Sequence, residues 1–210
     1  MNLSDMLTLV RRDLHDEDSE RYRFSDDALT RHILRAVKDF SESIPLEQTA
    51  VIATTPGSRD IDISDITGRV MIEAVEYPAG KFPPCFQRFS LWADTLTLLG
   101  DVIPDGGNAC FYYGGLHTLD EDSSTIPEMY EDLVAAGAAG YAAMEYAAFT
   151  INQVNIGGTE GAKDFLSFSK EQLSTFRREL KRLGRRNRVR VRNLYMPCEA
   201  PVSKTVVSGP

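Results

Sequence analysis

The sequence predicts an α+β protein: a helical bundle with an inserted, small antiparallel β domain and an extended C-terminal tail. Three observations indicate this class. Apolar residues recur every three or four positions near both ends of the chain, alternate with polar residues in the middle, and lose helical spacing after residue 184. The predicted bundle covers 1–46 and 118–184, with two N-terminal and two long C-terminal helices, the β insertion covers 47–117, and the tail covers 185–210.

Two helices are expected before Pro45. Ser4 can cap a short first helix, in which three apolar residues share one face: Leu7, Val10 and Leu14. Ser25 is a suitable N-cap for the second helix. Its apolar stripe runs until Pro45 stops it and consists of Leu29, Ile33, Val37, Phe40 and Ile44. His32 is one position off this stripe and is therefore expected to be exposed.

After Pro45 the pattern changes to a period of two, which is typical of strands. Strands are expected over 49–55, 69–77, 88–92, 95–99 and 109–113, with a short alternating segment around Ile61 and Ile63. Ala93-Asp94 fits a tight turn between two of them, and Pro83-Pro84 excludes a central strand from its surroundings. The middle of the chain is thus expected to form one small antiparallel sheet.

Helical signals return at Pro127, which is expected at the first position of a third helix. The run 133–151 is rich in alanine and glycine, so this helix is expected to be buried between others. A final helix is expected over 159–183, with Gly184 as its C-terminal cap. Its apolar stripe consists of Phe165, Phe168, Leu173, Phe176, Leu180 and Leu183.

The composition and motifs favour a protein without catalytic activity, cofactor or metal. The sequence has no GxSxG elbow, no phosphate-binding GxxxxGK[ST] loop and no GxGxxG after a strand. Its three histidines have no metal-ligand spacing with cysteine or acid. The sequence also shows no signal peptide and no apolar run long enough to cross a bilayer, so we expect the protein to be cytosolic when made and to have no membrane contact.

One segment is strongly basic in an otherwise acidic chain. Residues 177–192 hold nine Arg or Lys and a single acid, Glu179, whereas the whole chain has a net charge of −8. After Gly184, arginines alternate with Val189 and Val191, which indicates an edge strand or an extended arm with one basic face. Three functions fit this segment: a solvated end, a nucleic-acid-binding module, or docking on an acidic protein surface. Docking is favoured, because an acidic body would repel DNA elsewhere.

Several stretches resemble the head-to-tail adaptor (connector) proteins of tailed bacteriophages. The resemblance covers most of the chain. It is carried by ATTPGSRD at 53–60, VEYP at 75–78, PP at 83–84 with FSLWADTL at 89–96, YYGGLHTLD at 112–120, GAAGYAA at 137–143, NQVNIGG at 152–158, LGRRNRVR at 183–190 and LYMP at 194–197. None of these is a catalytic motif.

The resemblance implies a structural virion protein of the phage neck, one subunit of a homo-oligomeric ring, commonly a dodecamer, beneath the portal. Such a ring contacts the portal and the next tail or neck component, and genomic DNA passes through its channel. The expected docking residues are Arg185, Arg186, Arg188, Arg190, Arg192, Leu194, Tyr195 and Pro197. Glu128, Glu131 and Asp132 are expected to face either the lumen or a neighbouring subunit. Nucleic-acid binding through 177–192 remains the alternative.

Overall fold

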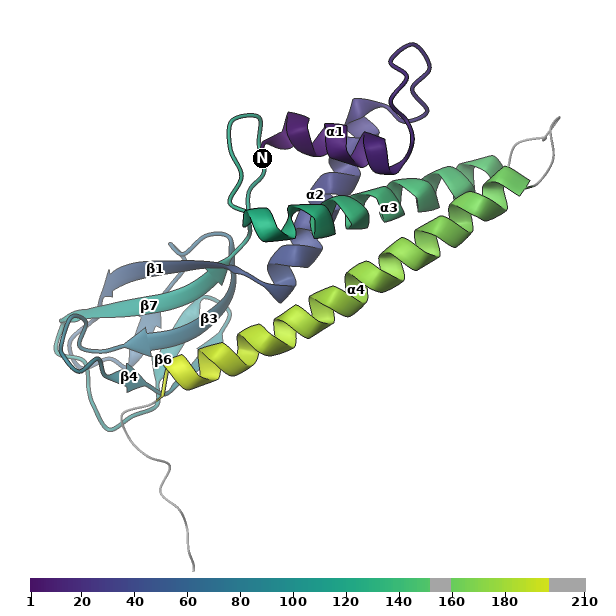
Figure 1. Ribbon diagram of the computed structural model, residues 1–210. Helices are drawn as coiled ribbons and strands as arrows, with labels where there is room; N and C mark the ends of the chain where they lie inside the picture. Colours follow the sequence, from purple (N-terminus) through teal and green to yellow (C-terminus); the bar gives the residue numbers. More distant parts are fainter. Residues whose placement is uncertain (152–159, 197–210) are drawn as a thin grey trace, which may run out of the picture. The chain divides into compact units, whose positions relative to one another are not determined.

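The computed structural model describes residues 1–151 and 160–196, which fall into two compact units. The helical unit comprises Met1–Leu46 and Gly115–Arg188, and the β unit comprises Glu47–Gly114 with the residues from Val189 on. Each unit has a hydrophobic core of its own. Figure 1 shows the helices and strands of both. The predicted class, a bundle of two N-terminal and two C-terminal helices with an inserted antiparallel β region, is confirmed.

The helical unit is built from α1 (Leu3–Asp13), α2 (Asp26–Ser43), α3 (Glu131–Ile151) and most of α4 (Glu160–Leu194). A short 3-10 helix, η1 (Glu128–Tyr130), follows Pro127 and leads into α3. Helices α1 and α2 both pack against α3. The predicted stripe of α2 forms much of this core, where Leu29, Ile33 and Phe40 are fully buried.

The two N-terminal helices begin at side-chain caps. Ser25 accepts a hydrogen bond from the Ala28 amide at 3.2 Å, as its position before α2 predicts. The predicted cap of α1 is wrong by two residues. Asn2, not Ser4, is the cap, because it forms a reciprocal capping box with Asp5.

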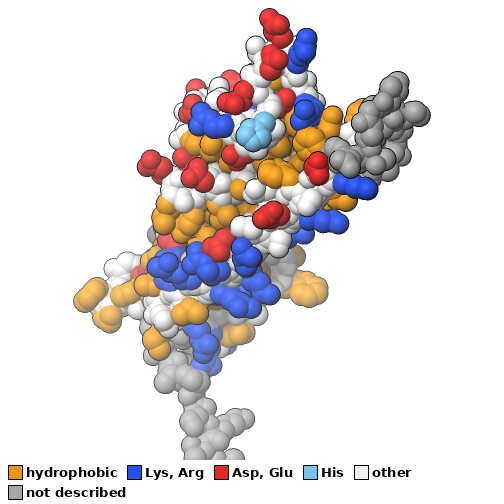
Figure 2. Space-filling view, turned by 45° about the vertical axis from the view of Figure 1, so that its right-hand side comes forward, with side chains coloured by type: hydrophobic (Ala, Val, Ile, Leu, Met, Phe, Trp, Pro, Cys, Tyr) orange, Lys and Arg blue, Asp and Glu red, His pale blue; other side chains and the backbone are white. Residues whose placement is uncertain are grey.

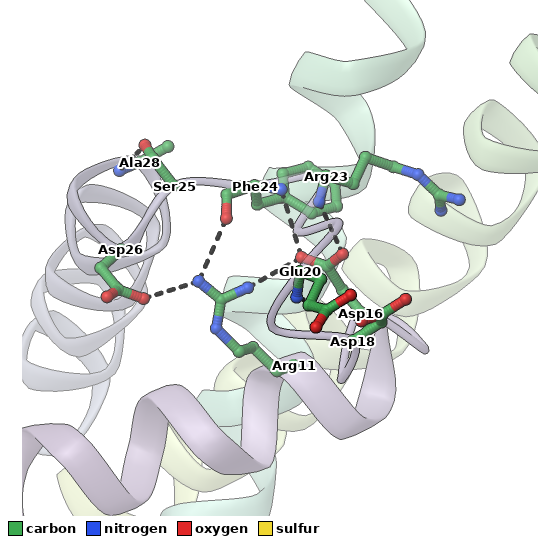
Figure 3. A network of polar contacts seen from close by, with 9 residues as sticks. All are labelled: Arg11, Asp16, Asp18, Glu20, Arg23, Phe24, Ser25, Asp26 and Ala28. Carbon is green, nitrogen blue, oxygen red and sulfur yellow. Dashed lines mark hydrogen bonds and ion pairs between the residues drawn. The ribbon is translucent and has the colours of Figure 1, made fainter.

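A buried ionic network holds the connection between α1 and α2 (Figure 3). The Arg11 guanidinium donates to Asp16 Oδ2 at 2.8 Å, to Asp26 Oδ1 at 2.6 Å and to the Phe24 carbonyl at 3.1 Å. Asp16 in turn accepts from the amides of Arg23, at 2.7 Å, and Phe24, at 3.2 Å. Arg11 and Asp16 are both nearly inaccessible to solvent, and Asp16 depends on Arg11 for its charge partner.

Helix α3 is buried as its small residues predict. Ala135, Ala138 and Ala142 are fully buried, and a Cβ added to Gly137 would lie 2.8 Å from the Phe176 ring of α4. The glycine therefore allows the backbone of α3 to approach an aromatic side chain more closely than any other residue would.

The β unit contains two sheets where the sequence suggested one. The four-stranded sheet has the order β1 (Leu46–Ala53), β7 (Asn108–Gly115), β3 (Arg69–Glu76), β4 (Phe86–Gln87). The three-stranded sheet has the order β2 (Asp60–Asp62), β6 (Thr95–Leu98), β5 (Phe89–Trp92). Both sheets contribute to one core, which includes Ile61, Val75, Leu96 and Phe111.

The hairpin between β5 and β6 forms where the sequence predicts it. Trp92 pairs with Thr95, and the turn residue Ala93 has a φ of 50°. Asp94 is fixed by an ion pair with Arg69. Trp92 is 86% exposed at the end of this hairpin.

The final helix is longer than the sequence suggested. Helix α4 extends to Leu194, so the expectation of an extended arm from residue 185 is wrong for 185–194. Gly184 lies inside the helix and is not its C-terminal cap. It is buried, and a Cβ at this position would lie 3.3 Å from the Ser43 carbonyl, so close packing explains the glycine. Residues 197–210 of the predicted tail lie outside the described residues.

His32 is also placed differently from the prediction. Its side chain is 5% exposed, because α3 covers the flank of α2 beside the apolar stripe, and its Nε2 lies 2.6 Å from Glu145 Oε2. Among the described residues, no helix is long and apolar enough to cross a membrane.

Candidate partner-binding surface

The exposed side of α4 carries nearly all of the basic segment. Four of its cations follow the spacing of a helix face and constitute the basic stripe: Arg178, Lys181, Arg185 and Arg188. They are separated by three, four and three residues, which places them one above another on the helix. Arg192 continues the same spacing in the last turn of α4. Figure 2 shows Lys and Arg side chains gathered on the visible face.

The basic stripe lies opposite the buried side of α4. Phe176, Leu180 and Leu183 point into the helical core, with exposures of 6% or less. The stripe residues are all exposed. The helix thus has one face for its own fold and a second face of like charge for solvent or a partner.

Within the described residues, no carboxylate forms an ion pair with a stripe residue. The two ion pairs of the basic segment lie beside the stripe: Arg182 with Glu179 at 2.8 Å, and Arg190 with Glu47. Like charges three or four residues apart on a helix repel each other by about 0.2–0.5 kcal/mol per pair. An anionic partner would relieve this repulsion.

The last residues of α4, from Val189 on, belong to the β unit and contact its strands. Arg190 forms an ion pair with Glu47 of β1, and the Tyr195 ring lies 5.1 Å from the rings of both Phe86 and Tyr112. Two of the expected docking residues, Arg190 and Tyr195, therefore already have partners inside the chain. Leu194 remains 53% exposed, and Pro197 lies outside the described residues.

A buried acid anchors the aromatic residues beneath Tyr195. Tyr112 donates its hydroxyl hydrogen to Glu76 Oε2 at 2.9 Å, and the Gly80 amide donates to Glu76 Oε1 at 2.9 Å. Burial and the neighbouring Glu76 raise the pKa of Tyr112 far above its usual value, so the phenol remains protonated. Burial also raises the pKa of the Cys110 thiol. These shifts disfavour the ionised, nucleophilic forms of both groups, so the cluster is suited to packing and recognition.

The three acids expected to face the lumen or a neighbour differ in their surroundings. Glu131 is 7% exposed, and its carboxylate lies 3.1 Å from the N-terminal amino group of Met1. Glu128 and Asp132 are exposed. The pKa of Asp13 is raised mainly by burial, and the nearby Asp132 raises it further. Only Glu128 and Asp132 are thus available at the surface of this turn.

His117 has a role in the fold that the sequence did not indicate. Its Nδ1 lies 2.9 Å from the Thr125 carbonyl oxygen and its Nε2 lies 3.0 Å from the Ile44 carbonyl oxygen, which joins the segment before η1 to the end of α2. Burial lowers the pKa of His117, although both carbonyl groups oppose this shift. Among the described residues, no group of three or more His, Cys, Asp or Glu side chains could hold a metal ion.

The sequence contained a signal for the basic stripe that the strand-like alternation of Arg188, Arg190 and Arg192 concealed. The cation spacing from Arg178 to Arg192 is helical, and Asn187 and Val191 continue the buried side of α4 beyond Gly184. The contacts of Tyr195 had no comparable signal, because their residues come from separate segments.

Comparison with known proteins gives one family match over most of the chain. Residues 1–193 match a family model described as SU10 adaptor protein. This match includes both units and the whole basic stripe. No curated protein matches the chain.

Proposed function

Because the chain belongs to the SU10 adaptor protein family and is thus a structural protein of a phage, we propose that it forms the head-to-tail adaptor ring. Copies of the chain assemble as a homo-oligomeric ring beneath the portal in the virion neck. The ring extends the DNA channel and offers its other side to the next tail or neck component. It acts through position and contact, with no chemical step.

The observation that carries the docking proposal is the basic stripe of α4. It is exposed, it has no carboxylate partner among the described residues, and its cations share one helix face. Arginine side chains form bidentate hydrogen bonds with carboxylates, so the stripe fits an acidic surface on the portal. Docking therefore uses a preformed helix in addition to the predicted tail. This lowers the ordering cost, which is about 1–2 kcal/mol for each residue that folds on binding.

Electron microscopy of the purified chain mixed with its portal protein tests the proposal. Full-length protein should add a ring of density beneath the portal. The double charge reversal Arg185→Glu/Arg188→Glu should remove this density. The matched control Lys163→Glu/Lys170→Glu changes two exposed cations on the same helix outside the stripe and should dock like the original chain. Docking that survives the stripe reversal would contradict the proposal.

The tail is tested by two deletions that differ by three residues. Removal of 197–210 leaves Tyr195 on Phe86 and Tyr112, whereas removal of 194–210 also takes Tyr195 away. We expect both truncated chains to remain folded and to dock more weakly than the full chain. Full docking by both would exclude a role for the tail.

Nucleic-acid binding through 177–192 is the second candidate, since clustered arginine also fits phosphate groups. It predicts an affinity for DNA that falls steeply with salt. The charge of the remaining residues disfavours DNA binding. The segment holds nine cations, yet the net charge of the whole chain is still −8, so the other residues are strongly acidic and repel DNA. Absence of DNA binding at low ionic strength, measured by fluorescence anisotropy, would exclude this candidate.

A further inference from the structure

The four-stranded sheet of the β unit carries a cavity that is lined by none of the four stripe residues. Its volume is about 490 Å³, and its walls come from β1, β3, β7 and the residue after α4. Three tyrosines (Tyr112, Tyr113, Tyr195) and two glutamates (Glu47, Glu73) line it. Aromatic faces and carboxylates together are the surroundings that a guanidinium group prefers.

The two glutamates of the cavity are not equivalent. Glu47 forms an ion pair with Arg190 of the same chain, so the rim of the cavity already holds one guanidinium. Glu73 is half-buried and, among the described residues, forms neither a hydrogen bond nor an ion pair. Burial raises the pKa of Glu73, and it is also the main cause of the raised pKa of Tyr195, to which Glu73 contributes. A half-buried carboxylate without an ion-pair partner is stabilised in its charged form by an added cation.

We propose that the cavity receives an arginine side chain from a second copy of this chain, with Glu73 as the carboxylate that binds it. This inference rests on the proposed ring, in which copies lie side by side. The acidic cavity and the basic helix are different surfaces of one chain. A contact between them is therefore heterologous, which is the type of interface that closes into rings.

The donor is Arg186 of the neighbouring copy. Arg186 is an exposed arginine of α4 outside the basic stripe, and among the described residues it has no ion pair. The other arginines on the flanks of α4 have partners: Arg182 pairs with Glu179, and Arg177 interacts with the Tyr141 hydroxyl. This assignment leaves the stripe free for the portal.

The chemistry of the cavity is tested with full-length protein and L-argininamide as the probe. Argininamide should shift the NMR signals of Tyr112 and Tyr195 and lower the pKa of Glu73, whereas the neutral isostere citrullinamide should do neither. Glu73→Gln should weaken the binding about tenfold, and the exposed control Glu121→Gln should leave it unchanged. Equal responses to both amides, or unchanged binding by Glu73→Gln, would overturn the assignment.

The source of the arginine is tested by charge reversal in the ring at the portal. Glu73→Arg and Arg186→Glu should each disrupt the ring, and the two changes combined in one chain should restore it. The control pair Glu121→Arg and Lys170→Glu changes two exposed side chains and should assemble normally. Failure of the combined variant to restore the ring, while argininamide still binds to the unchanged chain, would show that Arg186 of a second copy is not the donor.

This outcome is distinguishable from failure of the proposed function. If the unchanged chain adds no density to the portal, the adaptor proposal and the second copy as donor both fall. The argininamide titration then still decides whether the cavity recognises a guanidinium group.

Discussion

Arg11 is the residue on which the connection between the first two helices depends most. Its guanidinium bridges Asp16, Asp26 and the Phe24 carbonyl, and its Cζ lies 3.6 Å from the Tyr22 ring centroid. Asp26 is largely exposed and can be solvated without Arg11, whereas Asp16 cannot. The network therefore stabilises the fold mainly by compensating the buried charge of Asp16.

Replacement of Arg11 by methionine should lower the free energy of unfolding by about 3–5 kcal/mol, because it leaves a buried carboxylate without its partner. The exposed neighbour provides the control: Arg12→Met should change stability by no more than about 0.5 kcal/mol. Chemical denaturation followed by circular dichroism measures both. A loss for Arg11→Met as small as that for Arg12→Met would show that backbone amides alone satisfy Asp16.

His32 and His117 make stability depend on pH in the same direction. Burial lowers the pKa of both in the folded state, so the folded chain binds fewer protons than the unfolded chain near pH 6. Their contribution is complete above the unfolded pKa of about 6.5 and is lost as the pH falls below it. The slope is at most about 1.4 kcal/mol per pH unit for each histidine.

Denaturation between pH 8 and pH 5 should therefore show stability falling toward acid. The slope should decrease in His32→Gln and in His117→Gln, whereas the exposed control His15→Gln should keep the slope of the unchanged chain. Identical slopes in all four proteins would mean that neither buried histidine resists protonation.

At the scale of elements, the packing of α3 on α4 depends on a glycine that would otherwise weaken a helix. Gly137→Ala gains roughly 1 kcal/mol in helix propensity. It also places a methyl group 2.8 Å from the Phe176 ring. Such overpacking costs about 1–3 kcal/mol, so the net change should be destabilising. Thermal denaturation should show a lower melting temperature for Gly137→Ala.

A second change separates the steric explanation from other causes. Phe176→Leu removes the ring atoms that the new methyl group would meet, so adding Gly137→Ala to Phe176→Leu should no longer destabilise. If Gly137→Ala lowers the melting temperature equally in both backgrounds, contact with Phe176 is not the cause.

The sequence predicted elements well where one local signal determines them. Ser25 and the stripe from Leu29 located α2 closely, and Ala93-Asp94 located the β5–β6 hairpin. Strand β4, which consists of Phe86 and Gln87 alone, is too short to show a period. The end of α4 was missed because Gly184 resembles a cap, and its reason, the nearby Ser43 backbone, is a tertiary contact.

For the candidate sites too, features set by local sequence could be predicted and features set by tertiary contacts could not. The cations of the basic segment could be identified from composition, and their helical spacing was available in the sequence. The cavity beside Glu73 could not be predicted, because β1, β3, β7 and Tyr195 meet only in the folded β unit. Burial of Glu131 likewise depends on the position of the N-terminus.

At the scale of the whole molecule, two separate cores predict two separately disturbed regions. Phe111 is fully buried in the β unit and Phe40 is fully buried in the helical unit. Truncation of a buried phenylalanine to alanine costs about 3–5 kcal/mol. Phe111→Ala should therefore accelerate amide hydrogen exchange in the β strands and leave α2 and α3 nearly unchanged, since local stability follows local packing.

Phe40→Ala is the reciprocal experiment: it should accelerate exchange in the helical unit and leave the β strands nearly unchanged. Hydrogen exchange read by mass spectrometry resolves the two regions in one measurement. Equal acceleration throughout the chain for either variant would indicate that the cores unfold as one cooperative unit.

The exposed end of the β5–β6 hairpin has a practical consequence, because Trp92 is the only tryptophan in the chain. At 86% exposure, its indole is already surrounded by water in the folded protein. Its fluorescence emission should therefore be red-shifted from the start and should respond little to urea. A blue shift would instead indicate that another protein has covered the hairpin. The fluorescence of Trp92 therefore detects binding of a partner at this hairpin and changes little when the chain unfolds.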